Sequence, residues 1–312
     1  MKFKYPYSDA HCDTITRLYK NNDSINNSKY MVNLSHLRKY QGALQVFAIY
    51  NNGHLLKDDV ISIIEFLKNE CRVYSEYMSL ETKLKNTISN HMSDRITALL
   101  SIENLGAQRD FCIEDISFYN DNGIIMMSLC HNDNNILCGG IGENKSGLTP
   151  LGRRALRLMQ KNGVILDVSH MSDISFWEAL EEYSLPFTAS HSNSRTVYPN
   201  MRNLTDKQFV CLVKRGGVCG INYYPDFLEG ENSDIDSVIK HIEHFMSLGG
   251  ENSICLGSDF DGIEKTAQNL DNAGCVYKLF DKLLSINYNE SLVKKIAFGN
   301  FHNFLQKFET LK

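Results

Sequence analysis

The chain has 312 residues, of which 43% are hydrophobic and 22% are charged, as is typical of a globular protein with a large core. Its formal net charge is −5 and no basic run is present, which disfavours nucleic-acid binding. No run approaches the roughly 18 apolar residues of a membrane span, so no membrane partner is expected.

The ends of the sequence and its cysteines bear on the compartment. The first residues are polar and aromatic, without the apolar stretch of a secretory signal, and the last ones offer no hydrophobic tail for a lipid anchor. Nine cysteines are dispersed along the chain, and none forms a C-x-x-C pair. This usage favours a reducing compartment, so we expect a cytoplasmic protein.

Short apolar runs recur along the whole chain. Polar and apolar residues do not alternate in them, which predicts strands that are buried on both faces. Eight such runs cover residues 7–10, 43–50, 98–102, 124–130, 164–169, 186–190, 217–223 and 254–258. Helical patterns separate most of them, at 58–79, 150–162, 205–215 and 234–248. The alternation predicts a parallel sheet of the α/β class, and the eight strands predict closure into a single-domain (β/α)8 TIM-type barrel over residues 1–312.

Helix boundaries are marked by their flanking residues. Thr149 followed by Pro150 predicts a helix start, with Thr149 as the N-cap and proline at the first helical position. The pair Gly249-Gly250 predicts the end of the helix at 234–248.

Histidines and acidic residues follow six of the eight predicted strands. They are His11 with Asp13, Glu103, His131, His170, His191 and Asp259. Active sites of parallel α/β barrels lie at the C-terminal ends of the strands and draw residues from several of them. The pattern therefore predicts a metal-dependent hydrolase.

The first candidate ligands lie at the ends of the first and third strands. His11 and Asp13 are two residues apart and share one face of an extended segment, where imidazole and carboxylate suit a zinc-type cation. Cys12 between them is expected to point away as a core residue. Glu103 ends a buried strand, so it needs either a metal or an ion-pair partner at the barrel rim.

His170 and His191 end consecutive strands, which lie about 4.8 Å apart, so they could hold one cation together. A hydrogen-bonded core histidine is the alternative for either one alone. Asp167 is either structural or a support for a ligand. Two cations sharing Glu103 would lie about 3.5–4 Å apart with a hydroxide between them.

Other residues could act on a substrate. His131 could donate a hydrogen bond to a carbonyl oxygen that develops negative charge, and Asp259 could act as a general base or acid. Asp261 is expected to cap its loop. Either Arg195 or Arg202 could hold a carboxylate, although a surface ion pair is the ordinary alternative for each.

Two motifs are expected to have no catalytic role. His241 and His244 lie on a predicted helix, but their spacing is not the i, i+4 of a zinc-binding helix, so we expect a solvated helix face. The loop Gly139-Gly140-x-Gly142 is not followed by a helix start, which disfavours phosphate binding.

The segments that carry these residues resemble the membrane dipeptidase family, also called renal dipeptidases, which are metal-dependent amidohydrolase-like barrels. The resembling segments run from residue 9 to residue 262 and read DAHCD, LSIEN, SLCHND, GLTPLGRRALRLMQKNGVILDVSHMSD, ASHSNSR, RNLTD, NYYPDFL and GSDFDG. The resemblance implies a dipeptidase with two Zn²⁺ ions per chain and a metal-bridging hydroxide as the nucleophile. It assigns His11 and Asp13 to one ion and His170 and His191 to the other, with Glu103 as the bridge.

The resemblance also implies roles in substrate binding. His131 would contact the scissile carbonyl, Arg202 the C-terminal carboxylate, and Asp259 would carry the proton, while Tyr223 would line the pocket. It implies tolerance of a D-residue at the C-terminal position, β-lactam hydrolysis in some members, and a homodimer.

The sequence departs from the family at two positions. Asn104 stands where glycine is common, which is expected to narrow the pocket near Glu103, and Cys12 replaces a frequent asparagine. Without a signal or lipid anchor, the chain resembles bacterial-type cytoplasmic members of the family.

Two other functions stay open. One is an amidohydrolase acting on another small amide, such as an N-acyl amino acid or a lactam. The other is a non-catalytic metal-binding protein of the same fold, which the complete set of ligands together with Asp259 disfavours.

Overall fold

The computed structural model describes residues 3–84 and 94–312. Its strands form one sheet: β1 (Tyr7–Cys12), β2 (Ala43–Tyr50), β3 (Met78–Leu80), β4 (Ile96–Glu103), β5 (Ile124–Ser128), β6 (Ile165–Asp167), β7 (Thr188–Ala189), β8 (Val218–Ile221) and β9 (Ile254–Leu256). All pairs are parallel, in the order β1-β2-β4-β5-β6-β7-β8-β9, and β3 pairs with β4.

The sheet closes where the end of β1 meets the segment after β9. The Asp13 amide donates to the Phe260 carbonyl (2.9 Å), and the Asp259 amide donates to the His11 carbonyl (3.2 Å). The predicted (β/α)8 barrel is therefore confirmed, and its closing contacts lie at the C-terminal ends of the strands, among candidate site residues.

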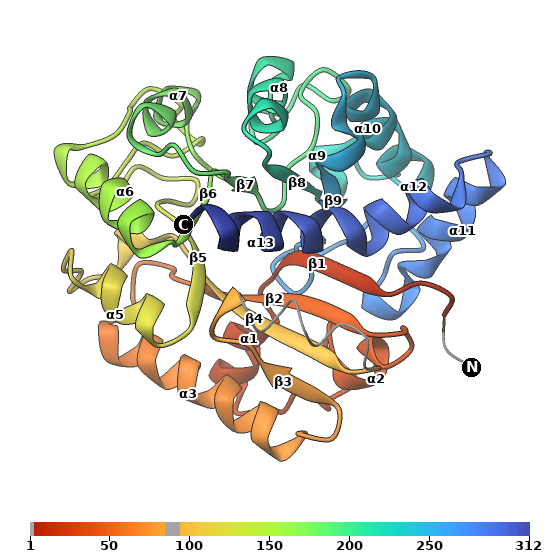
Figure 1. Ribbon diagram of the computed structural model, residues 1–312, viewed down its shortest axis with the longest axis horizontal. Coiled ribbons are helices and arrows are strands. Elements are labelled where there is room, and N and C mark those ends of the chain that lie inside the picture. Colours follow the sequence, from red (N-terminus) through yellow and green to blue (C-terminus); the bar gives the residue numbers. More distant parts are fainter. Residues whose placement is uncertain (1–2, 85–93) are drawn as a thin grey trace.

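Helices surround the strands (Figure 1). They are α1 (Thr14–Asn21), α2 (Leu34–Leu37), α3 (Lys57–Val73), α5 (Asp115–Asp121), α6 (Pro150–Asn162), α7 (Asp173–Glu182), α8 (Asp206–Lys214), α9 (Pro225–Leu228), α10 (Ile235–Ser247), α11 (Tyr277–Ser285), α12 (Glu290–Lys294) and α13 (Asn300–Leu311), with a π-helical turn at Lys295–Gly299 and 3-10 turns at Leu105–Ala107, Gly250–Asn252 and Ala273–Cys275. The buried side chains form one hydrophobic core, which fills the barrel and the space between strands and helices.

The predicted helix boundaries agree with the structure where capping residues marked them. The Thr149 side chain accepts a hydrogen bond from the Gly152 amide at the start of α6, with Pro150 at the first helical position. At the end of α10, Gly249 has a φ of +88°, a conformation in which glycine meets no Cβ penalty.

The predicted helix over residues 58–79 is wrong at its end. α3 stops at Val73, and Met78–Leu80 forms strand β3, which pairs with residues 96–98 of β4. β5 pairs with β4 only from Leu100 onward, so β3 occupies the edge of β4 that β5 leaves open. An apolar segment satisfies a helix face or a buried strand equally well, and pairing with β4 decides between them here.

Helix α13 covers the barrel at the N-terminal ends of its strands. The Asn300 side chain at its start donates to the Ile254 carbonyl (2.7 Å) at the beginning of β9. Near its end, Lys307 and Lys312 lie against Gly216 and Gly163, in the turns before β8 and β6. In Figure 1 the helix crosses the centre of the view in front of the strands. Access to the barrel is therefore from the other end.

Glycines allow the last strands to approach one another closely. A Cβ at Gly220 or at Gly257 would lie 2.0 or 1.9 Å from the Ser190 carbonyl oxygen, so neither position has room for a side chain. This close approach packs Ser190, the residue before His191, directly against β8 and the segment after β9.

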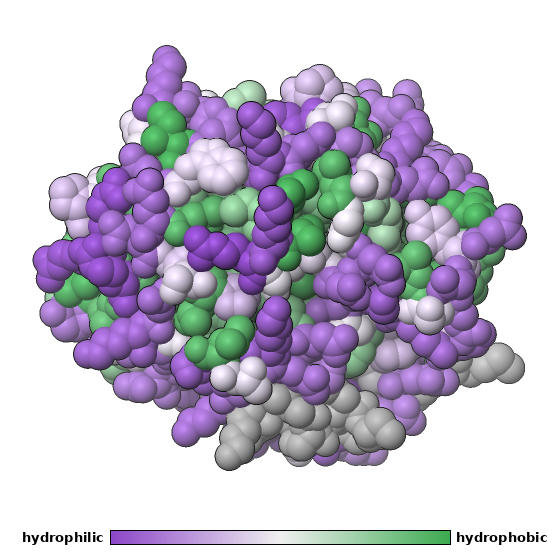
Figure 2. Space-filling model, turned by 45° about the horizontal axis from the view of Figure 1, so that its top comes forward, coloured by the Kyte–Doolittle hydropathy of each residue, from purple (hydrophilic) through white to green (hydrophobic). Residues whose placement is uncertain are grey.

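No helix in the described ranges is long and apolar enough to cross a membrane. On the face shown in Figure 2, hydrophilic side chains are spread widely and hydrophobic ones form small separate areas.

Candidate active site

A cavity of about 520 Å³ opens at the C-terminal ends of the strands. It is lined by Asp13, Thr16, Arg17, Lys20, Tyr50, Glu103, His131, Asn132, His170, Tyr224, Phe227, Asp259, Asp261, Gly262, Ile263 and Glu264. Five of the predicted site residues are among them, and His11 and His191 lie just beneath, as the distances below show. The polar residues that follow six different strands are therefore brought together.

Glu103 lies between two groups of candidate ligands. Its Oε2 atom is 3.6 Å from His11 Nε2, which in turn lies 3.4 Å from Asp13 Oδ2. Its Oε1 atom is 2.9 Å from His170 Nε2 and 3.6 Å from His191 Nε2. Each carboxylate oxygen thus faces its own set of donors, and each set is compact enough to hold a metal ion.

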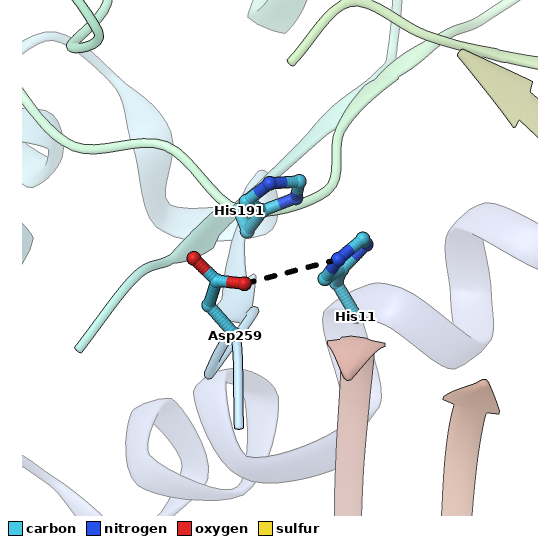
Figure 3. A group of neighbouring side chains, drawn as sticks. All are labelled: His11, His191 and Asp259. Atoms are coloured by element: carbon cyan, nitrogen blue, oxygen red, sulfur yellow. Dashed lines mark ion pairs between the residues drawn. The ribbon is translucent and has the colours of Figure 1, made fainter. Parts of the chain in front are cut away.

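A third compact group joins the two sides of the site. It consists of His11, His191 and Asp259 (Figure 3), in which Asp259 Oδ1 lies 3.9 Å from His11 Nε2. The rings of His11 and His191 stack with their centroids 3.8 Å apart. These side chains come from the ends of β1, β7 and β9.

The electrostatics of the site favour a bound cation. Burial alone would lower the pKa of His11, but the carboxylates of Glu103, Asp13 and Asp259 outweigh it and raise that pKa to about 10. Burial also raises the pKa of Glu103 well above its usual range. His11 Nε2 and Asp13 Oδ1 are buried and form no hydrogen bond within the described structure. Buried ligand-type atoms that lack a hydrogen bond and lie among several carboxylates fit a metal ion, and nitrogen and oxygen ligands suit zinc.

Two candidate site residues have strained backbone conformations. His170 has a φ of +71° and Asp259 a φ of +63°, in the left-handed region that residues other than glycine rarely adopt. Such conformations persist where the surrounding structure holds them, and they cluster at functional sites.

Buried carboxylates support the candidate ligands from below. Asp9 Oδ1 accepts hydrogen bonds from the His11 amide (3.2 Å) and the Ser258 amide (2.9 Å). Asp167 Oδ1 accepts from the amides of Ser169 (3.0 Å) and Ser190 (2.9 Å). The sequence analysis left the role of Asp167 open and missed Asp9, although Asp9 lies two residues before His11 on the same strand.

His131 and Asp259 both line the cavity, and burial shifts the pKa of each side chain away from its usual value. Burial, with the nearby charge of Arg202, lowers the pKa of His131 to about 4, so its imidazole is neutral at neutral pH. Burial raises the pKa of Asp259 to about 6. The Asn222 side chain donates to Asp259 Oδ2 (2.9 Å) and so orients the carboxylate. Asn222, which the sequence analysis missed, directly follows β8.

Arg202 lies deeper than the cavity lining. Its Nη2 donates to the His191 carbonyl and its Nη1 to Ser192 Oγ (both 3.0 Å), while its Nε lies 3.1 Å from His170 Nδ1. Burial lowers the pKa of Arg202. Its guanidinium therefore contacts the segments that hold both histidines.

Arg195, the other arginine considered, is held in an ion pair. Its Nη1 and Nη2 atoms lie 2.8 and 2.9 Å from the two oxygens of Asp173, and it is not among the residues lining the main cavity. The structure thus gives Arg195 a structural partner and leaves Arg202 as the arginine nearest the candidate ligands.

Tyr223 was expected to line the pocket, but its side chain is fully buried and packs edge-on against Phe260. The next residue, Tyr224, lines the cavity instead, together with Phe227. The chain leaves β8 at Ile221, so regular strand alternation could not assign the direction of either tyrosine.

The two departures from the family pattern have structural explanations. Asn104 has a φ of +66°, where asparagine is tolerated and glycine is favoured. Its side chain donates to the Asn51 carbonyl (2.8 Å) and accepts from the His131 amide (3.1 Å) rather than lining the cavity, so the expected narrowing is not seen. Cys12 is fully buried in the core, as expected.

The prediction of a solvated face for His241 and His244 is wrong for His241. That residue is fully buried, with Nδ1 accepting from the Ser194 amide (3.0 Å) and Nε2 lying 3.0 Å from the Leu228 carbonyl. His244 is partly exposed and pairs with Asp206 (2.8 Å). Neither histidine belongs to a group of metal-ligand residues among the described ones.

The glycine-rich loop follows β5 and serves close packing. A Cβ at Gly139 or Gly140 would lie 2.1 or 2.3 Å from the carbonyl oxygens of Ser146 or Asn132. The glycines therefore allow two backbone segments to touch.

Gly262→Ala is expected to lower the affinity for metal and the activity by at least about 10-fold, as typically found when support of a metal ligand is lost. A Cβ at Gly262 would lie 2.1 Å from Asp13 Oδ2 and 2.6 Å from Asp259 Oδ1, so both carboxylates would have to move. Metal content after dialysis measures the effect. Gly299→Ala is the control, because a Cβ there would meet no atom closer than 3.5 Å; equal metal content in both variants would contradict the prediction.

Comparison with known proteins identifies relatives over the whole barrel. The profile of the membrane dipeptidase family matches residues 2–312. A Schizosaccharomyces pombe protein described as an uncharacterized dipeptidase is 30% identical over 226 residues, which cover 70% of this chain and 55% of that protein. Dipeptidase tcpJ of Claviceps purpurea is 25% identical over 261 residues, covering 82% of this chain and 61% of tcpJ. The match thus spans only 55–61% of the length of these two relatives.

Solved structures share the fold. The metallopeptidase called dipeptidase AC superposes with a TM-score of 0.87 at 21% identity, covering 98% of this chain and 99% of the other. A metallopeptidase from Rhodobacter sphaeroides, solved with a phosphinate mimic of the dipeptide L-Ala-D-Ala, has a TM-score of 0.87 at 20% identity, covering 97% and 99% of the two chains.

Proposed function

The chain belongs to the membrane dipeptidase family, and we propose that it is a zinc-dependent dipeptidase that hydrolyses the peptide bond of small dipeptides. The observation that carries the proposal is the position of Glu103, whose two oxygens face two separate pairs of ligand-type side chains. The residues on both sides are buried at the base of an open cavity, where a substrate can reach them.

We propose two zinc ions per chain. His11, Asp13 and Glu103 would hold one, and Glu103, His170 and His191 the other; both groups are compact in the structure. Bound there, two ions would polarise the substrate carbonyl and activate a water molecule as the nucleophile. The same donors accept manganese or cobalt, so zinc rests on the family and on the nitrogen and oxygen ligands.

Two side chains would act on the substrate directly. The neutral imidazole of His131 would donate a hydrogen bond to the carbonyl oxygen as negative charge develops there. Asp259, oriented by Asn222, would take a proton from the attacking water and pass it to the leaving amine. The raised pKa of Asp259, about 6, brings it close to the value that suits proton transfer at neutral pH.

The cavity sets the size and type of substrate. We propose that Arg202 binds the free carboxylate of the dipeptide, and that Tyr224 and Phe227 contact its side chains. Dipeptides with a C-terminal D-residue are included in the proposal, in line with the ligand of the Rhodobacter sphaeroides relative. The whole chain would act as one metallohydrolase domain, consistent with its single sheet. Homodimer formation and a cytoplasmic location stay predictions.

One observation favours an amidohydrolase acting on another small amide or lactam. The guanidinium of Arg202 already contacts three protein groups and does not line the cavity, so a carboxylate would have to displace or join these contacts. A substrate without a free carboxylate would not need Arg202 as a binding partner. A dipeptide compared with its C-terminally amidated form separates the two functions.

Arg202→Ala is expected to raise the KM for free dipeptides at least about 10-fold, because a charged hydrogen bond worth roughly 1.5–3 kcal/mol is lost. The KM for the amidated dipeptide should change much less. Since Arg202 also contacts the histidine segments, zinc content is measured in the same samples. Arg195→Ala is the matched control and should leave both KM values near wild type, because Arg195 pairs with Asp173. Equal KM increases for free and amidated substrates would contradict the proposed role.

A further inference from the structure

Two pairs of buried residues clamp neighbouring strands beneath the candidate ligands in the same way. Asp167 Oδ1 accepts from the Ser190 amide and its Oδ2 from the Ser190 hydroxyl (2.9 and 2.5 Å). Asp9 Oδ1 accepts from the Ser258 amide and its Oδ2 from the Ser258 hydroxyl (2.9 and 2.5 Å). The first pair joins β6 to the residue that follows β7, and the second joins β1 to the segment that follows β9.

The two clamps differ in their contact with a histidine ring. Ser190 Oγ lies 2.7 Å from Nδ1 of His191. Ser258 Oγ, in contrast, has no hydrogen bond to an imidazole nitrogen of the described residues and lies 3.4 Å from the His11 carbonyl oxygen. Asp167, Ser190 and His191 therefore form a chain of hydrogen bonds that ends on a candidate metal ligand.

The direction of this chain follows from the donors around Asp167. Two backbone N–H groups donate to its Oδ1, and a carboxylate offers only acceptor atoms. The Ser190 hydroxyl, which has one proton, then donates it to Asp167 Oδ2. Its oxygen is left to accept from His191, so the proton of the neutral imidazole lies on Nδ1. This leaves Nε2 without a proton. Its lone pair faces Glu103 Oε1 at 3.6 Å and His170 Nε2 at 2.9 Å, and is the one that a cation would use.

We propose that Ser190 and Asp167 are positioning residues that fix the tautomer of His191 for metal binding through Nε2. The inference rests on the proposed metal site, but the tautomer exists without metal and can be measured separately. Ser190 is thus assigned a role as a hydrogen-bond relay that its place in the ASHSNSR segment does not reveal.

The tautomer is read in metal-free protein labelled with ¹⁵N-histidine, by long-range proton–nitrogen correlation, with His191→Gln identifying the resonances of that ring. Wild type should show His191 protonated on Nδ1. Ser190→Ala should give a mixture of tautomers. Asp167→Asn should shift the His191 proton toward Nε2. The oxygen of the new side chain must still accept from the two backbone amides, so its NH₂ group would donate to Ser190 Oγ. The Ser190 hydroxyl would then donate to His191 Nδ1, which could no longer carry the proton.

Zinc titration of the same variants gives the second readout. Ser190→Ala should weaken one of two binding events roughly 10- to 100-fold, the usual effect of losing a ligand's supporting contact, and leave the other unchanged. Ser258→Ala loses the equivalent clamp and should keep both affinities within a few-fold. Thermal unfolding shows whether each variant is folded.

An Nε2-protonated His191 in wild type would overturn the proposal, as would the same zinc titration for Ser190→Ala and Ser258→Ala. If the tautomers behave as stated but wild type binds no zinc, the proposed metal site fails while the relay stands.

Discussion

Glu103→Gln will lower kcat/KM for a dipeptide by at least about a thousand-fold, well beyond the roughly 10- to 100-fold typical of residues that only support a ligand. In the wild type, one carboxylate oxygen faces His11 and the other faces His170 and His191. A glutamine would present an oxygen to one group and an NH₂ to the other, and an NH₂ cannot bind a cation. Steady-state kinetics and zinc content per chain, measured on the same preparation, give the result.

Glu264→Gln is the matched control for this change. Glu264 lines the same cavity but is exposed and belongs to no group of candidate ligands. Its loss should change kcat/KM only a few-fold. Full activity of Glu103→Gln with two zinc ions bound would refute the bridging role.

Asp259→Asn is expected to lower kcat about 10²- to 10⁴-fold, the range for loss of a positioned acid or base. An asparagine keeps the shape and can still contact Asn222, but it cannot take a proton from the attacking water. KM and zinc content should stay near wild type, which separates this variant from Glu103→Gln.

The pH profile gives a second test of Asp259. The carboxylate must be ionised to accept a proton, so activity should rise with pH through its pKa, which burial raises to about 6. A bound cation lowers the pKa of a neighbouring carboxylate, so the acid limb is expected at or below pH 6. Asp259→Asn should lose this limb. An unchanged limb in the variant would assign it to another group.

Asp261→Asn is the control carboxylate, two residues away. Asp261 accepts hydrogen bonds from Thr14 (2.6 Å) and from the Met31 amide (3.1 Å), and so holds its loop, as the sequence analysis expected. Its replacement should lower the unfolding temperature and reduce kcat less than about 10-fold. The loss expected for Asp259→Asn is at least about 100-fold. Similar losses of kcat in both variants would contradict a specific role for Asp259.

The barrel and the meeting of its polar residues could be predicted because both follow from simple regularities. Buried parallel strands lack alternation, and their C-terminal ends share one mouth of a barrel, so His11, Glu103 and His191 had to lie near one another once the fold was assigned. The start of α6 was predicted to the residue because Thr149 and Pro150 act through local chemistry alone.

The remaining features depend on tertiary contacts that the sequence does not encode locally. β3 replaces the end of a predicted helix because β4 has an open edge there. His241 is buried because the Ser194 amide and the Leu228 carbonyl meet its two ring nitrogens. Tyr224, and not the predicted Tyr223, lines the cavity because the chain is irregular after β8 ends at Ile221.

The positions of Asp9, Asn222 and Arg202 could not be predicted for a related reason. Each contacts a residue on or after a neighbouring strand: Asp9 contacts Ser258, Asn222 contacts Asp259, and Arg202 contacts His170. A sequence pattern assigns a residue to a strand end but does not assign its partner on the next strand.

The most direct test of the proposed function is the hydrolysis of a panel of L-L and L-D dipeptides by zinc-loaded protein, with a chelator-treated sample alongside. The account predicts cleavage that is lost with the chelator and restored as zinc is added back, reaching its maximum near two ions per chain. No cleavage of any dipeptide by protein with two zinc ions bound would contradict it.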